Sequence, residues 1–290
     1  MYHHFLPYII TLMMLSLFAS CAKDGEYDLP EETSLVVQAY IDSGDFPVVI
    51  LTRSIPVTND YQDLSDLSKY IERWATVTIS DGEREEVMSG RIDQSYTPSY
   101  IYTNYNLRGE KGKTYTIRIH CTNGYETEAV TTIPDEQIVV ERFTAEKVAT
   151  SDTLYQLYVH LDTQQTTAQY FKVFAQHEKE RQSVLSSMFG VFTKEMIDNG
   201  RVAVNRGRTN LVKDYTPHFS INDTVVVKLS AINEDQYDYW RTFENMASLS
   251  RNPLFPTSIN LPSNVPGCIG YWFGYASERY VVPIKDVIKP

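Results

Sequence analysis

The chain has 290 residues and a formal net charge of −11. Its length allows a sizeable core and suggests two domains, and its content of 42% hydrophobic and 12% aromatic residues excludes both a disordered chain and a polytopic membrane protein. The negative charge argues against nucleic acid as a partner, because no broad basic surface is available to neutralise phosphates.

The first predicted element is a secretion signal. Residues 5–19 form one apolar run, which has the length of a signal-peptide core and falls short of the roughly 20 residues of a membrane span. The small residues Ala19 and Ser20 directly precede Cys21, a pattern that resembles the lipobox of bacterial lipoproteins. We expect residues 1–20 to be removed and Cys21 to carry lipid that anchors the protein to a membrane. The alternative is an ordinary signal peptide followed by an incidental cysteine.

Residues 21–33 read as an acidic tether, with Asp24, Glu26 and Asp28 close to the anchor. Such a stretch resembles the surface-export signal of Bacteroidota lipoproteins, and the alternative is a solvated linker. No second apolar segment follows, so we expect the rest of the chain to be soluble. The expected location is the outer membrane, with the protein facing the cell surface.

Residues 34–134 are expected to form a first β-sandwich. The segment 113–121 alternates most regularly, and one set of its side chains is predicted to face the core: Tyr115, Ile117, Ile119 and Cys121. Leu107, a glycine-containing turn and Tyr115 resemble the tyrosine corner of immunoglobulin-like and fibronectin type III domains. The fold class predicted for this part is therefore an immunoglobulin-like sandwich.

One stretch of this first domain departs from the strand pattern. Residues 60–74 place apolar side chains three and four positions apart and predict a short amphipathic helix that ends near Trp74. Asp60, Asp63 and Asp66 could suggest calcium, but their spacing differs from that of an EF-hand loop. We interpret them as the solvated face of the helix and expect no metal site.

Residues 135–290 are expected to form a second, mostly β domain with one helix near 234–247. In the predicted strand 169–177, Phe171, Val173 and Ala175 form the inner set. Asn233 and Gln236 form a capping box at the start of the helix. One face of this helix carries a stripe that is expected to pack on the sheet: Tyr239, Trp240, Phe243, Met246 and Ala247.

The last distinctive segment, 262–277, combines proline, glycine and aromatic residues. Trp272 is its largest side chain and the candidate ligand-contact residue, because aromatics on a rigid loop lose little entropy on binding. The competing interpretation is that Trp272 and Phe273 plug the end of the second sandwich.

Several segments together resemble the Bacteroidota outer-membrane lipoproteins grouped as domain-of-unknown-function family 4249 (DUF4249). They include LVVQAYIDSGDFPVVILTRSIPV, the helix EDQYDYWRTF and the ending LPSNVPGCIGYWFGYAS, and the resemblance covers about residues 34–284. Members of that family often accompany TonB-dependent outer-membrane transporters, so the resemblance implies a role in uptake. It supplies no catalytic residues, and Cys268 stands where the family usually has a small residue.

The sequence contains no motif of a catalytic or cofactor site, including G-x-S-x-G, H-E-x-x-H and the P-loop. We therefore predict a non-enzyme without catalytic residues, metal or cofactor. Cys121 and Cys268 are too few for a disulfide scaffold; two buried thiols are favoured over a bond between them.

The predicted function is that of a lipid-anchored surface protein that captures a small solute, a peptide or a glycan, or that serves as an accessory of a TonB-dependent transporter. An alternative is a structural or adhesive surface module without a role in transport. A more distant alternative is an envelope hydrolase whose site cannot be recognised in the sequence.

Overall fold

The computed structural model describes residues 33–54, 68–180, 183, 185–197, 199–207, 215–249 and 261–289. Cys21, the acidic residues Asp24, Glu26 and Asp28, and the three aspartates between 60 and 66 lie outside these ranges. Residues 34–290 form one compact unit. The chain is mostly β-structure with sandwich packing, as expected, and includes one long helix, α2 (Glu234–Leu249).

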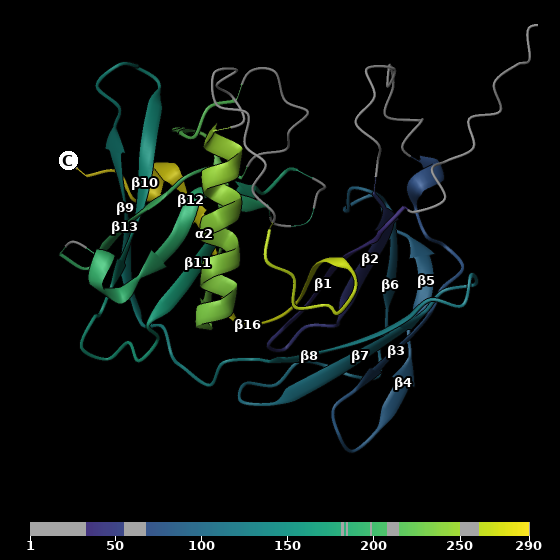
Figure 1. The fold of residues 1–290 in the computed structure, drawn as a ribbon. Helices are drawn as coiled ribbons and strands as arrows, with labels where there is room; N and C mark the ends of the chain where they lie inside the picture. Colours follow the sequence, from purple (N-terminus) through teal and green to yellow (C-terminus); the bar gives the residue numbers. More distant parts are fainter. Residues whose placement is uncertain are drawn as a thin grey trace, which may run out of the picture. The chain divides into compact units, whose positions relative to one another are not determined.

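The largest sheet has eight strands. Their order is β12 (Ser186–Thr193), β11 (Tyr170–His177), β15 (Thr224–Ile232), β16 (Ile269–Pro283), β1 (Leu35–Asp42), β2 (Val48–Arg53), β6 (Tyr100–Thr103) and β5 (Ser89–Ile92). The first half of β16 pairs with β1 in parallel, and its second half pairs with β15 in antiparallel orientation (Figure 1). This sheet therefore takes strands from both sides of the boundary expected near residue 134.

Two four-stranded sheets complete the β-structure of the described residues. One has the order β4 (Glu85–Val87), β3 (Thr76–Ser80), β7 (Thr114–His120) and β8 (Glu126–Thr132). In the other, β10 (Leu154–Leu161) pairs with β9 (Val140–Lys147), β13 (Arg201–Val204) and β14 (Phe219–Ser220). Single 3-10 turns, η2 (Lys194–Met196) and η3 (Ile284–Asp286), follow β12 and β16.

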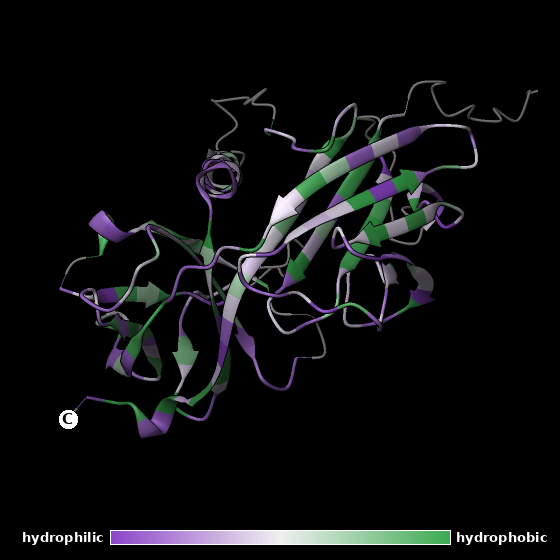
Figure 2. Cartoon of the chain, turned by 90° about the horizontal axis from the view of Figure 1, so that it is seen from below, coloured by the Kyte–Doolittle hydropathy of each residue, from purple (hydrophilic) through white to green (hydrophobic). Residues whose placement is uncertain are grey.

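The pleat of the eight-stranded sheet separates two environments. On β15, Val225, Val227 and Leu229 join a core cluster that also includes residues of both four-stranded sheets. The intervening Val226 and Lys228 point to the opposite face, because successive side chains of a strand alternate. Figure 2, which views α2 end-on, shows that the strands carry both hydrophobic and hydrophilic residues. The inner set predicted for residues 169–177 is confirmed, since Phe171, Val173 and Ala175 belong to the same core.

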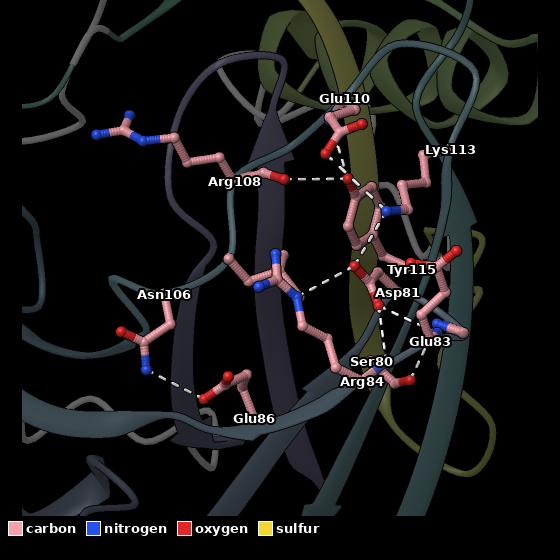
Figure 3. A network of polar contacts seen from close by, with 12 residues as sticks. Ser80, Asp81, Glu83, Arg84, Glu86, Asn106, Arg108, Glu110, Lys113 and Tyr115 are labelled. Carbon is pink, nitrogen blue, oxygen red and sulfur yellow. Dashed lines mark hydrogen bonds and ion pairs between the residues drawn. The ribbon is translucent and has the colours of Figure 1, made fainter.

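The predicted tyrosine corner is present. The Tyr115 hydroxyl donates to the carbonyl oxygen of Arg108 at 3.1 Å and accepts from the backbone N–H of Glu110 at 2.9 Å (Figure 3). Nearby, Lys113 lies 3.0 Å from Asp81 and ties the start of β7 to the end of β3. Tyr115, Ile117, Ile119 and Cys121 are all buried, so the predicted inward face of β7 is confirmed.

The helix α2 begins at the predicted capping box. The backbone N–H of Gln236 donates to Asn233 Oδ1 at 3.0 Å, and that of Asn233 donates to Gln236 Oε1 at 3.2 Å. The Gln236 amide also donates to the carbonyl oxygen of Gly274 on β16 at 3.0 Å. The cap therefore fixes the start of α2 to the sheet, and the helix packs against β11 and β12 (Figure 1).

The prediction of a helix over residues 60–74 is wrong for residues 68–74, which are the part of this range that the structure describes. Residues 68–70 form one 3-10 turn, and Ile71 bridges to Thr52 of β2. The backbone N–H of Glu72 donates to the carbonyl oxygen of Leu51, and its carboxylate pairs with Arg53 at 2.6 Å. These bonds to β2 replace the helical bonds and leave Trp74 79% exposed.

Candidate functional site

A cavity of about 1110 Å³ lies on the face of the eight-stranded sheet opposite the core. Its floor comes from alternate residues of β1, β2, β6, β11, β15 and β16, and the predicted stripe of α2 forms one wall. The turn after β1 and the residues between β5 and β6 contribute the other side. The same pleat that fills the core with aliphatic side chains therefore directs a mixture of polar, aromatic and aliphatic side chains into the cavity.

Aromatic rings make up much of the cavity floor. Tyr271 and Tyr275 lie on the cavity face of β16, opposite to the face that carries Trp272, and Phe174 lies on β11. The Phe174 ring meets the rings of Tyr275 and Trp240 nearly at right angles, with centroids 5.7 and 6.0 Å apart. The indole N–H of Trp240 donates to the Tyr275 hydroxyl at 3.0 Å. These contacts hold the rings in fixed orientations and join α2 to the sheet.

A buried ion pair lies among these rings. The Lys228 ammonium on β15 is 3.0 and 2.9 Å from the two carboxylate oxygens of Asp42 on β1, and both side chains are buried. The Ser277 hydroxyl donates to Asp42 Oδ1 at 2.5 Å. Burial lowers the pKa of Lys228, while the negative charge of Asp42 opposes that shift.

A second buried pair joins the sheet to the helix. The Lys172 ammonium on β11 lies 2.6 Å from Glu244 Oε1 on α2, and the same oxygen accepts from the backbone N–H of Gly190 at 2.9 Å. Burial lowers the pKa of Lys172 and raises that of Glu244, so desolvation disfavours the charged form of each partner. Removal of either one would leave a buried charge uncompensated.

The tyrosines of the floor are held in their neutral form. Burial raises the pKa of Tyr40, Tyr271 and Tyr275 well above the usual value of 10.0. Their hydroxyls therefore act as neutral hydrogen-bonding groups at physiological pH.

The mouth of the cavity carries paired charges beside exposed rings. Arg279 lies 2.8 Å from Asp45, and Arg91 lies 2.8 Å from Asp93. Phe46 and Tyr105 meet edge to face at 5.0 Å, and Tyr105 is 55% exposed. These rings lie on the side of the cavity that the β1–β2 turn and the residue range after β6 provide.

The sequence-predicted site residues lie elsewhere. Cys21 is outside the described residues. Trp272 is fully buried on the core face of β16, where its indole N–H donates to the carbonyl oxygen of Tyr115 at 3.1 Å. Trp272 is therefore a core residue, but it packs toward Tyr115 of β7 instead of plugging the end of a second sandwich together with Phe273, which lies in a separate aromatic cluster. Tyr271 and Tyr275 of the same strand line the cavity. Cys121 and Cys268 are buried free thiols.

The two buried ion pairs were not predicted from the sequence. Lys172 and Lys228 each interrupt an apolar strand, and an isolated charge in such a run is the available signal of a buried pair. Their partners could not be inferred, because Asp42 is 186 residues from Lys228 in the chain and Glu244 is 72 residues from Lys172.

In the part of the chain that the structure describes, no cluster of three or more His, Cys, Asp or Glu side chains is arranged to hold a metal ion. Over the same residues, no helix has the length and apolar character needed to cross a membrane.

Comparison with known proteins identifies the family. The family model described as Domain of unknown function (DUF4249) matches residues 23–280. The chain belongs to the DUF4249 family. The resemblance drawn from the sequence is thus confirmed at the level of the family. No curated protein matches this DUF4249 member.

Among solved structures, this DUF4249 chain is similar to the FN1–FN3 domains of chicken CNTN1. The sequences are 10% identical, the match covers 69% of this chain and 61% of that chain, and the TM-score is 0.25. The chain thus spans about three fifths of the length of that structure.

Proposed function

We propose that this protein captures a solute at the outer membrane of a Bacteroidota cell and presents it to a TonB-dependent transporter. The observation that carries the proposal is the cavity of about 1110 Å³ with its aromatic floor and oriented polar groups. Concave sites lined by aromatic side chains and a few placed polar groups are typical of ligand binding.

The anchor and the location are part of the same proposal. Their support is the apolar run before Cys21 and the acidic residues after it. The transporter partnership is supported by the family resemblance. A lipid anchor would keep the cavity near a transporter in the same membrane.

We propose a binding role without catalysis. The support is that the charged side chains lining the cavity, in the described ranges, are engaged in ion pairs with one another or with a neighbour. A general base or a nucleophile needs a group that is available to exchange a proton or attack a substrate. The floor instead holds its charges in fixed partnerships.

A retention assay tests the capture of a solute. The mature protein is incubated with the small-molecule fraction of spent growth medium and washed, and the compounds released on denaturation are identified by mass spectrometry. Phe243 on α2 lines the cavity and is 37% exposed, so Phe243→Ala removes contact area with little effect on folding. Trp74→Ala removes an exposed aromatic that is not among the residues lining the cavity.

We expect the parent and Trp74→Ala to retain the same compounds in equal amounts, and Phe243→Ala to retain at least about tenfold less, which corresponds to about 1.4 kcal/mol. Retention that is absent, or equal in all three proteins, would contradict the proposal.

A further inference from the structure

The charges of the cavity balance one another. The charged side chains that line it within the described ranges each have a partner of opposite sign: Asp42 with Lys228, Asp45 with Arg279, Asp93 with Arg91, and Glu244 with Lys172. At the floor, a charged ligand would have to break one of the two buried pairs, Asp42–Lys228 or Glu244–Lys172, or lie there without a counter-charge, and both are costly. The charge pattern therefore favours a ligand without net charge.

The aromatic positions that would attract a cation are occupied by lysines of the protein itself. The Lys228 ammonium lies 4.2 Å from the centroid of the Phe174 ring and 5.1 Å from that of Tyr275. The Lys172 ammonium lies 4.7 Å from the Trp240 ring centroid. A ligand ammonium would meet like charge at these positions, so the rings do not form a cage for a cationic solute.

Other rings lie toward the mouth of the cavity, and the hydroxyl of one of them, Tyr105, accepts a hydrogen bond from Arg91. Phe243 meets Trp240 nearly at right angles at 5.6 Å on the wall formed by α2. Tyr105 and Phe46 lie on the other side, and the Arg108 guanidinium packs over Phe46 at 3.9 Å and restrains it. Flat rings on two sides of a cavity suit a ligand that offers apolar faces to both.

The cavity also offers uncharged hydrogen-bonding groups. Gln38 on β1 and Thr97 between β5 and β6 are exposed and line it, and Ser186 at the start of β12 is partly exposed. A pyranose ring matches this combination, because its C–H faces stack on aromatic rings while its hydroxyls donate to and accept from amides and hydroxyls. A short peptide fits less well, since its charged ends would have no free counter-charge.

Resting on the proposed capture of a solute, we infer that the ligand is an uncharged oligosaccharide. The cavity of about 1110 Å³ exceeds the roughly 300–1,000 Å³ that is usual for drug-sized ligands, so it has room for several linked sugar rings. The ring faces contact Phe243 and Tyr105, and the hydroxyls bond to the neutral groups between them.

Calorimetric titration of the mature protein with defined hexasaccharides tests this inference. The neutral probes are cellohexaose, mannohexaose, xylohexaose and chitohexaose. The charged probes are the fully deacetylated, cationic form of chitohexaose and the anionic hexagalacturonate. We expect at least one neutral probe to bind, and the charged probes to bind at least about tenfold more weakly than that neutral probe.

Variants locate the binding in the cavity. Phe243→Ala and Tyr105→Ala should each weaken the neutral probe at least about tenfold, while Trp74→Ala leaves its affinity unchanged. Circular dichroism and a denaturation midpoint identify any variant that is not folded. If one of the two cavity variants is not folded, the affinity of the other variant decides the test. Affinity that is insensitive to both variants would overturn the inference, as would failure of every neutral probe to bind or tighter binding of a charged probe.

The retention assay separates this inference from the proposed function. If retention depends on Phe243 but the retained compounds are charged solutes or peptides, the capture of a solute stands and the uncharged oligosaccharide is wrong. If retention does not depend on the cavity, both proposals fail.

Discussion

Lys228 illustrates how one residue fixes the chemistry of the cavity floor. Its ammonium is bonded to Asp42 and surrounded by the rings of Phe174, Tyr275 and Tyr40. A buried ion pair adds little net stability over an apolar pair, but loss of one partner leaves a charge without compensation. Replacing one partner of the Asp42–Lys228 pair should therefore lower the free energy of unfolding by more than the net contribution of the intact pair.

Replacement of Asp42 should reveal this asymmetry. We expect Asp42→Asn to lower the free energy of unfolding by about 3–5 kcal/mol, because Lys228 then stays buried without its carboxylate. Urea denaturation measures the change. The double variant Asp42→Leu/Lys228→Met should recover most of the loss. Asp45→Asn breaks the exposed pair with Arg279 and should cost less than about 1 kcal/mol; equal losses for Asp42→Asn and Asp45→Asn would contradict this account.

The buried tyrosines predict a loss of stability at alkaline pH. Burial raises the pKa of Tyr271 and Tyr275. Tyr275 faces Asp42 of β1, Lys228 of β15 and Tyr239 of α2, and Tyr271 faces Tyr239 and Gln38. The unfolded chain releases these protons near pH 10, so above that pH the folded state holds more protons and the free energy of unfolding falls. Lys172 and Lys228 affect the free energy of unfolding in the opposite direction. Their pKa is lowered in the folded state, so the unfolded chain holds more protons and the free energy of unfolding rises with pH up to about pH 10.5.

Above about pH 10.5 the contribution of the lysines is complete and that of the tyrosines remains. We expect the urea midpoint to fall between about pH 10.5 and about pH 11.5, and phenolate absorbance to rise together with unfolding. A midpoint that does not change over this interval would show that the floor tyrosines titrate normally in the folded protein.

At the scale of single elements, the sequence predicts those features of strands and helices that depend on residues close together in the chain. Alternation identified the inward face of β7, and the Asn233–Gln236 box located the start of α2. The parallel pairing of β16 with β1 was not predictable in this way, since it joins residues more than two hundred positions apart. Gly270 makes it possible, because it has φ +120° and a Cβ there would overlap the carbonyl oxygen of Val37.

The same strand decides the role of Trp272. Because Trp272 is fully buried and bonded to the carbonyl oxygen of Tyr115, Trp272→Ala should lower the free energy of unfolding by about 3–5 kcal/mol. The exposed Trp74 provides the matched control, and Trp74→Ala should stay within about 0.5 kcal/mol. Unchanged stability of Trp272→Ala together with lost solute retention would assign Trp272 to ligand contact instead of core packing.

At the scale of the whole molecule, the sequence predicts that the protein is anchored to the outer membrane through Cys21. We expect Cys21→Ala to release the protein from the outer-membrane fraction, since the lipid on that residue is the proposed anchor. Fractionation of cells followed by immunoblotting measures the release. Protease treatment of intact cells should remove the parent protein, and replacement of Asp24, Glu26 and Asp28 by Ala should protect it. A Cys21→Ala protein that stays in the membrane pellet as firmly as the parent would refute the anchor.

The three tryptophans of the chain lie in different surroundings, which allows the location of a bound solute to be measured. Trp240 lines the cavity, Trp272 is fully buried on the core face of β16, and Trp74 is exposed and absent from the cavity lining. In a Trp74→Phe protein, Trp240 therefore reports the cavity while Trp272 gives a constant background.

A fluorescence titration tests directly whether the captured solute binds in this cavity. The Trp74→Phe protein is titrated with the compounds that the parent retains from spent medium. The account predicts a saturable change of tryptophan emission that disappears when Trp240→Phe is added. A change that persists without Trp240, or no change at concentrations that saturate retention, would place the solute elsewhere and contradict the account.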